Sequence, residues 1–233
     1  MKRLLKKILE MAGLARSAAG PLKVEEFQQR SAKEVFTLIH DRNYWNSAES
    51  VSGTGSEVGQ AAALIEELPA LFKSFGITSM LDIPCGDFNW MKEVDLSGVR
   101  YIGGDIVEAL VEANKERFKQ RPELEFRVVD LIADPLPTCD LVMVRDCLVH
   151  LSFADIERAL GNIRASGAKY LLATTFTEHP TNTDIVTGDW RPLNLQRAPL
   201  NLPAPVQVID ERCLEANGRY CDKVMALWDL RTF

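Results

Sequence analysis

The chain has 233 residues, of which 46% are hydrophobic and 26% are charged, and its formal net charge is -6 with a pI near 5.2. This length is sufficient for one large domain with a well-buried core. An acidic balance argues against a general nucleic-acid binder, which would carry a basic face, so we expect no nucleic-acid partner.

The cysteines and histidines argue against disulfide or metal chemistry. The cysteines form an odd set without CxxC spacing, which is typical of reduced thiols in a cytoplasmic protein. They are Cys85, Cys139, Cys147, Cys213 and Cys221. The histidines at 40, 150 and 179 are too scattered for a ligand cluster, so we predict no metal site.

Residues 1–15 alternate apolar side chains with lysines at helical spacing, which predicts a basic amphipathic helix. The apolar run is too short and broken for a membrane span or a signal peptide. Such a helix can make a weak contact with an anionic membrane or a partner; the alternatives are a helix that caps its own domain and a loosely ordered terminus. A linker is expected at 17–21.

A second helical pattern covers residues 22–40, and a Gly/Ser-rich stretch at 41–56 follows it. Tyr44 and Trp45 lie in this stretch, and aromatic residues favour an ordered loop over a free linker. We therefore divide the chain into a helical and loop cap, residues 1–56, and a main domain, residues 57–233.

The main domain begins with a predicted helix over 57–75, capped by Ser56 and ended by Gly76. An apolar run then ends in Asp82, breaks at Pro84 and Gly86, and continues as an amphipathic segment. This pattern predicts a strand, a turn and a helix. In an open α/β sheet, such a turn lies at a crevice suited to a nucleotide-like ligand.

Residues 99–105 form the next predicted strand, which closes on Asp105. This acid follows Asp82 at close to the spacing of about 20 residues at which nucleotide-binding units place a carboxylate for ribose hydroxyls. The alternative is a solvated acid at a strand end. A helix over 107–119 and a strand over 124–129, ending at Asp130, follow.

The strand predicted over 140–145 is almost continuously apolar, as a buried parallel strand requires. It brings Asp146 and His150 to the same sheet edge as the crevice. The stretch from Ser152 to Asp155 then resembles a capping box that opens a helix over 153–165. A helix N-terminus favours a neutral imidazole, which can accept a proton; a structural role for His150 is the alternative.

The last third of the chain contains a strand over 169–176, an irregular segment over 177–205 and two closing strands at 206–210 and 223–230. Irregular segments of this length are usually functional or disordered. Trp190, Arg191 and Asn194 offer a flat face, a cation and an amide, which suit a polar, sugar-like or carboxylated acceptor. A loop packed against the sheet edge is the alternative.

The stretch from Asp82 to Phe88 resembles the first motif of the class I S-adenosylmethionine-dependent methyltransferases, which has an acid followed by three alternating glycines. Only Gly86 is kept here, since Pro84 and Phe88 replace the outer two. The stretches 43–56 and 188–195 also resemble a bacterial branch of this family. Together the three matches are far more specific than any one of them.

The resemblance implies a Rossmann-like α/β fold with a mostly parallel seven-stranded sheet and one antiparallel strand. It implies S-adenosylmethionine as the cofactor, residues 41–56 as a lid over it, and Asp130 and Leu131 at the adenine. A structural loop anchored by Trp45 is the alternative to the lid. The predicted cofactor contacts are Asp82, Pro84, Cys85, Gly86, Phe88, Trp90, Asp105, Ile106, Asp130, Leu131 and Arg145. The predicted acceptor contacts are Tyr44, Trp45, Trp190, Arg191 and Asn194.

The expected reaction is methylation of a small molecule or glycan, at oxygen. Methyl transfer from a sulfonium is a displacement in which the enzyme positions the acceptor and removes the proton of a hydroxyl. We predict His150 as the base, with Asp146 second. A non-catalytic binding subunit is a second hypothesis, because two glycines are lost. A dinucleotide-dependent oxidoreductase is disfavoured for the same reason.

Overall fold

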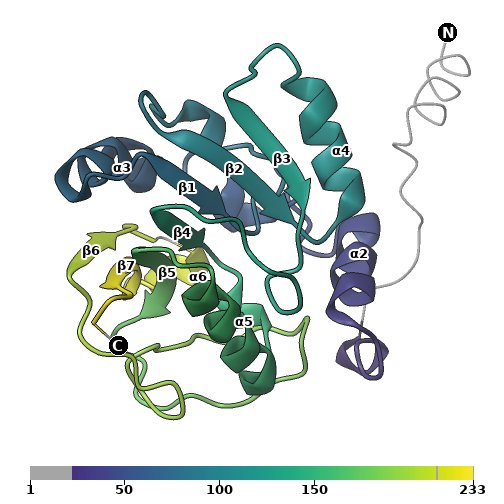
Figure 1. Ribbon diagram of the computed structural model, residues 1–233. Coiled ribbons are helices and arrows are strands. Elements are labelled where there is room, and N and C mark those ends of the chain that lie inside the picture. The colour runs from purple at the N-terminus through teal and green to yellow at the C-terminus, as the bar shows by residue number, and fades with distance from the viewer. Residues whose placement is uncertain (1–22, 214, 233) are drawn as a thin grey trace, which may run out of the picture.

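The computed structural model describes residues 23–213 and 215–232. The helix predicted at 1–15 and the linker at 17–21 lie outside these residues. Within the described range, seven strands form one sheet in the order β3-β2-β1-β4-β5-β7-β6 (Figure 1). They are β1 (Ser79–Asp82), β2 (Arg100–Asp105), β3 (Leu124–Val128), β4 (Leu141–Val144), β5 (Tyr170–Phe176), β6 (Gln207–Asp210) and β7 (Lys223–Asp229).

The strand directions confirm the predicted fold class. Strands β1 to β5 pair in parallel, whereas β7 pairs antiparallel with both β5 and β6. The order reverses between β1 and β4, where the chain has passed outward through β2 and β3 and then returned. In open α/β sheets, ligands bind at such a switch point, beyond the carboxyl ends of the strands.

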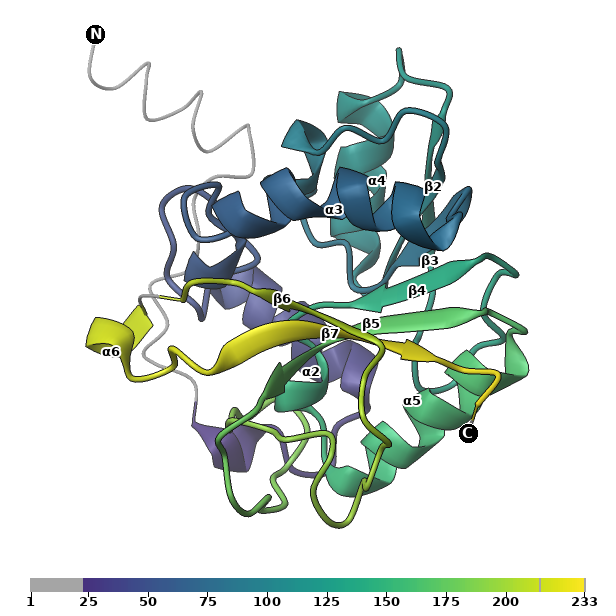
Figure 2. The ribbon, with the colours of Figure 1, turned by 90° about the vertical axis from the view of Figure 1, so that its left-hand side faces the viewer.

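Helices cover both faces of the sheet. Figure 2 shows α3 (Ala62–Phe75) and α4 (Glu108–Arg117) on one side of it and α5 (Phe153–Ala165) on the other. Two separate clusters of buried apolar side chains fill the spaces between these layers. The central strands are therefore buried on both faces, which agrees with the nearly continuous apolar runs of β1 and β4.

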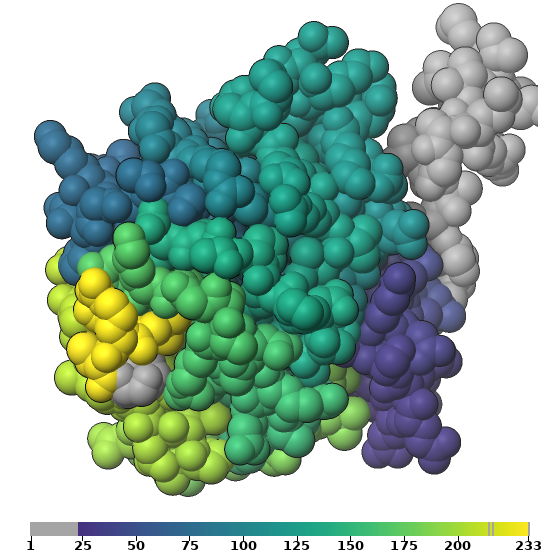
Figure 3. All heavy atoms as spheres, viewed as in Figure 1, coloured from purple at the N-terminus to yellow at the C-terminus, as the bar shows by residue number. Residues whose placement is uncertain are grey.

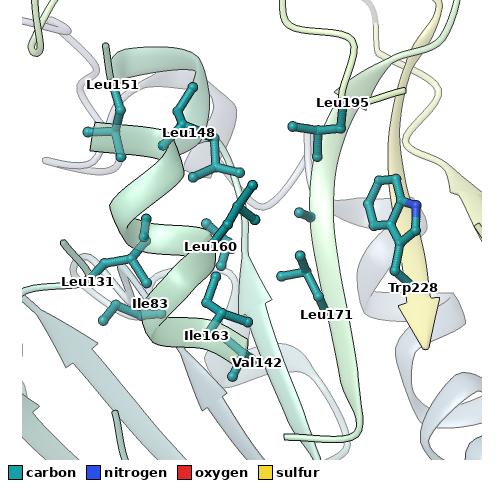
Figure 4. Close-up of a cluster of buried hydrophobic side chains, with 14 of the residues drawn as sticks. Ile83, Leu131, Val142, Leu148, Leu151, Leu160, Ile163, Leu171, Leu195 and Trp228 are labelled. Atoms are coloured by element: carbon teal, nitrogen blue, oxygen red, sulfur yellow. The ribbon is translucent and has the colours of Figure 1, made fainter. Parts of the chain in front are cut away.

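Helix α5 shows how local sequence sets this packing. The Ser152 hydroxyl accepts a hydrogen bond from the Asp155 N–H and caps the helix. The Ser152 N–H donates to the Thr187 hydroxyl instead of Asp155, so the second half of the predicted capping box is absent. Ile156, Leu160 and Ile163 then recur on one face and are buried. Figure 4 shows Leu160 and Ile163 directed from α5 toward the strands of the sheet. Each buried side chain of this kind contributes about 1.5–3 kcal/mol.

The helical pattern predicted over 22–40 is divided in two. A short 3-10 helix, η1 (Val24–Glu26), precedes α2 (Ala32–Arg42), and Gln29 between them has a positive φ of 66°. A new helix starts at α2 because Ser31 and Glu34 form a capping box. The arrowheads of β2 and β3 point toward α2 (Figure 1), and the purple surface of this segment adjoins the teal part of the chain (Figure 3).

The start predicted for the helix at 57–75 is wrong. Helix α3 begins only at Ala62, and Ser56 does not cap it. The first residues have other partners, because the Glu57 carboxylate accepts from the Ser47 hydroxyl and the Val58 N–H donates to Glu49. The predicted end is confirmed, since Gly76 closes the helix with a φ of 61°.

The helix predicted after β1 is also wrong. The segment contains only one 3-10 turn, η3 (Met91–Glu93). Phe88 has a φ of 57°, and the Asp87 carboxylate accepts from the Asn89 N–H, so a side chain competes for the backbone donors that a helix would use. No helix N-terminus therefore follows this turn.

A short helix, α6 (Glu215–Gly218), lies between β6 and β7 and was not predicted.

Among the described residues, no helix has both the length and the apolar character to cross a membrane. The five cysteines are all unpaired. The division of the chain at residue 56 stays a prediction.

Candidate active site

A cavity of about 470 Å³ lies at the carboxyl ends of β1, β2 and β4. Its size is within the range of about 300–1,000 Å³ that is usual for small-molecule sites. Asp82 and Asp105 end two of these strands, and Arg145 and Asp146 directly follow the third. Four ionisable side chains from three separate stretches thus meet in one cavity.

Asp105 is held rigidly by two backbone donors. Its Oδ2 atom accepts a hydrogen bond from the Gly86 N–H at 3.0 Å, and Oδ1 accepts one from the Val107 N–H at 2.9 Å. Burial raises the pKa of Asp105 to about 6, against the opposing effect of these two donors. Each carboxylate oxygen keeps further acceptor capacity, so Asp105 can receive hydroxyl donors from a ligand in the cavity.

Asp82 ends the neighbouring strand β1. The Tyr101 hydroxyl donates to Asp82 Oδ2 at 2.7 Å, and both side chains are buried. Burial raises the pKa of Asp82 to about 7, although the tyrosine hydrogen bond opposes this shift. Burial thus raises the pKa of both acids.

Gly86 allows the backbone of the turn to approach the neighbouring loop. Its φ is 55°, and a Cβ atom added there would lie 2.1 Å from the Ser52 Oγ and 2.9 Å from the Ser52 Cβ. Both features require glycine, because a side chain disfavours this conformation and would also collide with Ser52.

We expect Gly86→Ala to destabilise the protein by more than the cost of its backbone conformation, which is about 1–2 kcal/mol. Gly98→Ala is a matched control, since Gly98 has a φ of 80° with nothing near its added Cβ. Urea unfolding of both variants, with limited proteolysis within residues 43–56, separates the two effects. Equal destabilisation and equal cleavage would contradict the role given to the Ser52 contact.

Residues 43–56, here called the cover loop, are fastened to the turn after β1. The Asp87 carboxylate accepts from the Ser50 hydroxyl at 2.9 Å and from the Val51 N–H at 3.0 Å. The Asp87 N–H donates to the Ser52 hydroxyl at 3.2 Å. Ser52 to Ser56 line the cavity. The loop therefore forms one wall of the site, where the predicted lid would lie.

A buried ion network forms the wall beyond β4. The Lys223 Nζ lies 2.7 Å from Asp146 Oδ2 and 3.7 Å from Glu211 Oε2, and Arg145 binds the same Glu211 oxygen at 2.6 Å. Arg145 also donates to the Gly55 carbonyl at 2.8 Å, which joins the network to the cover loop. The position of this loop thus depends on charges from three distant parts of the chain.

The network keeps Asp146 ionised. Burial alone would raise the pKa of Asp146, but the charges of Lys223 and Arg145 and the hydrogen bond from Lys223 together outweigh burial and lower the pKa to about 2. Lys223 is held protonated in return: burial opposes its charge, and the carboxylates of Asp146 and Glu211 raise its pKa above the ordinary value. A carboxylate so strongly stabilised is a weak proton acceptor, which makes Asp146 the poorer candidate base.

His150 lies on the cavity wall within the 3-10 turn η4 (Leu148–His150). Its Nδ1 atom is 2.8 Å from the Asp189 carbonyl oxygen. Because a carbonyl only accepts, Nδ1 carries the proton and the Nε2 of the neutral ring is left with a free lone pair. Burial lowers the pKa of His150 below its ordinary 6.5. The Trp45 ring packs against the imidazole at a centroid distance of 5.3 Å.

The cavity brings together most of the predicted cofactor residues and part of the predicted acceptor set. The predicted residues that line it are Asp82, Pro84, Cys85, Gly86, Trp90, Asp105, Ile106, Asp130, Leu131, Arg145, Asp146, His150, Trp45 and Trp190. These residues come from six separate stretches of sequence, which only the fold places around one space.

Four predicted contacts do not line the cavity and need correction. Phe88 is buried in an aromatic cluster with Tyr101, Phe118 and Phe126, where its apolar ring is better accommodated than at a polar site. Tyr44 packs instead on Phe27 at 6.1 Å. The remaining two, Arg191 and Asn194, belong to the long loop.

Arg191 and Asn194 are buried and stabilise that loop by hydrogen bonds to backbone carbonyls. The Arg191 guanidinium donates to the carbonyls of Leu148 and Leu151 at 3.0 and 2.8 Å. The Asn194 amide donates to the carbonyls of Thr177 and His179, each at 3.1 Å. An irregular loop leaves many backbone carbonyls without partners, and buried guanidinium and amide groups satisfy them. The sequence pattern does not show which backbone carbonyls of the loop need such partners.

Several cavity residues were not predicted. They include Phe36 and His40 of α2, Phe176 at the end of β5, and Glu215, Tyr220 and Lys223 near the C-terminus. One sequence signal could have identified Lys223, since a lysine within an apolar strand is rarely buried unless a carboxylate is paired with it. The others occur in segments without a motif. In the described part of the chain, no group of three potential metal ligands is present.

Comparison with known proteins agrees with this geometry. Residues 81–168, which run from the end of β1 through β2, β3, β4 and α5, match a family model described as a methyltransferase domain. No curated protein matches the chain.

Solved structures share the fold at low sequence identity. Human N-acetylserotonin methyltransferase in complex with SAM is 17% identical, with a TM-score of 0.59 over 90% of this chain and 62% of that one. The N-methyltransferase NodS from Bradyrhizobium japonicum, in complex with S-adenosylhomocysteine, is 14% identical, with a TM-score of 0.50 over 60% of this chain and 72% of that one. A second NodS structure is 13% identical, with a TM-score of 0.51 over 73% of this chain and 96% of that one. This chain thus has the Rossmann-like class I methyltransferase fold, and it spans about 62% of the length of the human enzyme.

Proposed function

We propose that the protein is an S-adenosylmethionine-dependent methyltransferase that acts on an oxygen atom of a small molecule or glycan. The main support is the pair formed by Asp105 and Gly86, which lie at the switch point of the sheet, 3.0 Å apart through one hydrogen bond. They belong to the segment that matches a methyltransferase domain. The carboxylate supplies acceptors, and the glycine supplies close access to the backbone.

The residues at this end of the cavity fit the proposed cofactor. Asp105 has spare acceptor capacity for two ribose hydroxyls. Asp130 and Leu131 line the cavity beyond it, in the place assigned to the adenine by family resemblance. When bound, S-adenosylmethionine would supply an electrophilic methyl group on a sulfonium. The acidic lining suits a cationic cofactor, since Asp82, Asp105 and Asp130 all face the same space.

His150 is the proposed general base. Its Nδ1 proton is directed at the Asp189 carbonyl, so Nε2 can accept the proton of an acceptor hydroxyl as that oxygen forms its new bond to carbon. The lowered pKa keeps the ring neutral at physiological pH. Because a hydroxyl must lose its proton when its oxygen is methylated, a neutral His150 in the cavity wall favours oxygen as the methylated atom.

Calorimetric titration with S-adenosylmethionine, S-adenosylhomocysteine and NAD tests this proposal. We expect saturable binding of the first two and none of NAD, because the turn after β1 lacks the outer glycines that admit a pyrophosphate. Binding of NAD alone would assign the site to a dinucleotide. Failure of both sulfur compounds to bind would favour the hypothesis of a non-catalytic binding subunit.

A further inference from the structure

Three aromatic rings from distant parts of the chain form one wall of the cavity. They belong to Phe176, Trp190 and Tyr220. The ring centroids of Trp190 and Tyr220 lie 5.1 Å apart, and those of Phe176 and Tyr220 lie 5.8 Å apart, in edge-to-face arrangements. These contacts hold the rings in place, while 39% of Trp190 remains exposed. This wall therefore offers an open indole surface to the ring of a ligand.

Carboxylates outnumber cations next to this wall. Lys223 faces Asp146 at 2.7 Å, Glu211 at 3.7 Å and Glu215 at 4.0 Å. The second cation, Arg145, is already bound to Glu211 at 2.6 Å. The two cations thus serve three carboxylates, which leaves one negative charge in excess.

The excess negative charge lies at Glu215. Its Oε1 atom accepts from the Thr54 hydroxyl at 2.8 Å, and its side chain lines the cavity. Its Lys223 contact is the longest of the three. Its Oε2 atom accepts from the Cys213 thiol at 3.7 Å. Each carboxylate oxygen of Glu215 can accept further hydrogen bonds, so this end of the cavity suits a donor group of a ligand.

This balance changes the acceptor class that the sequence predicted. A carboxylated acceptor would add negative charge beside Glu215 and Asp146, and like charges at short range disfavour binding. Arg191, the cation expected to hold such a group, is buried against the carbonyls of Leu148 and Leu151. Arg191 is therefore not placed to bind a carboxylated acceptor, and Glu215 favours an acceptor that carries a positive charge.

We propose that the methyl acceptor is a hydroxylated ring compound that bears an ammonium group. Its ring packs on Trp190 and Tyr220, its ammonium group binds Glu215, and its hydroxyl lies at His150 Nε2. Aromatic faces and carboxylates together recognise organic cations. Glu215 is then a specificity-determining residue. This inference rests on the proposed function, because it names the substrate class of the same site.

Three phenols of matched shape test the proposal: tyramine, 4-ethylphenol and 3-(4-hydroxyphenyl)propionate, which are a cation, a neutral compound and an anion near neutral pH. Their binding is measured by calorimetry in the presence of S-adenosylhomocysteine. We expect tyramine to bind about five- to tenfold more tightly than 4-ethylphenol, and the anion to bind most weakly. Equal binding of the three, including equal absence of binding, would overturn the proposal.

Glu215→Gln should reduce the preference for tyramine over 4-ethylphenol to about twofold or less. Glu157→Gln removes the same charge from an exposed position of α5 outside the cavity and should leave the preference unchanged. Weaker binding of S-adenosylmethionine to Glu215→Gln would assign Glu215 to the cofactor and overturn the inference alone. Failure of the wild-type protein to bind S-adenosylmethionine would instead remove the proposed function on which it rests.

Discussion

S-adenosylmethionine should bind to an Asp105→Asn variant on the order of 10²- to 10⁴-fold more weakly than to the wild type. The substitution removes a buried carboxylate with acceptor capacity for two ribose hydroxyls, and each hydrogen bond to a charged group contributes about 1.5–3 kcal/mol. Asparagine keeps the size of the side chain but brings an amide N–H₂ toward the donors of Gly86 or Val107. Calorimetric titration measures the loss.

Asp105 also supports the fold, so the variant requires a control for structure. Asp95→Asn is suitable, because Asp95 is exposed, lies outside the cavity and likewise accepts a backbone N–H, that of Ser97. Thermal unfolding of both variants shows whether Asp105→Asn remains folded at the temperature of the titration. A folded Asp105→Asn variant with unaltered affinity would overturn the ribose assignment.

The second large effect concerns His150. We expect His150→Asn to lower kcat by about 10²- to 10⁴-fold, which is the usual contribution of a general base. The Asn amide can still donate to the Asp189 carbonyl, so the loop keeps its hydrogen bond while the proton acceptor is lost. The measurement is S-adenosylhomocysteine formation with a hydroxylated acceptor that the wild-type protein methylates. Affinity for S-adenosylmethionine should not change.

The pH profile provides an independent check on His150. Burial lowers its pKa below the ordinary value of 6.5, so the neutral, active form persists to lower pH than for a solvent-exposed histidine. The wild-type rate should therefore be flat near neutral pH and fall only below pH 6.5 as the ring gains a proton. His179→Asn, at a histidine outside the cavity, should leave the rate unchanged. An acid limb above pH 6.5 would exclude His150 as the base.

Local sequence patterns were most informative where the chain forms strands. The apolar runs that end in Asp82, Asp105 and Arg145 predicted β1, β2 and β4 with small errors at their ends. Such runs are decisive because a strand buried on both faces tolerates few other residues. The carboxyl ends of parallel strands then meet at one edge, so the placement of these charged residues in one crevice followed from the pattern.

Predictions failed where distant segments compete for the same backbone groups. The helix expected after β1 is absent because Asp87 binds Asn89 and the cover loop. Helix α3 starts late because Glu49 and Ser47 engage its first turn. Helix propensity describes a segment alone and does not include such partners.

The amino-acid sequence by itself determined the strands and the acids at their ends, because these depend on apolar periodicity and turn residues close together in the chain, and the resemblance of its motifs to a known family implied the fold class. Only the tertiary structure decided the chemistry of the acceptor end. In the fold, Arg191 binds backbone carbonyls and Lys223 pairs with Asp146. Glu215 lines the same cavity as the aromatic rings of Phe176, Trp190 and Tyr220. The charge of a site is the sum over side chains from distant segments, and no local pattern contains that sum.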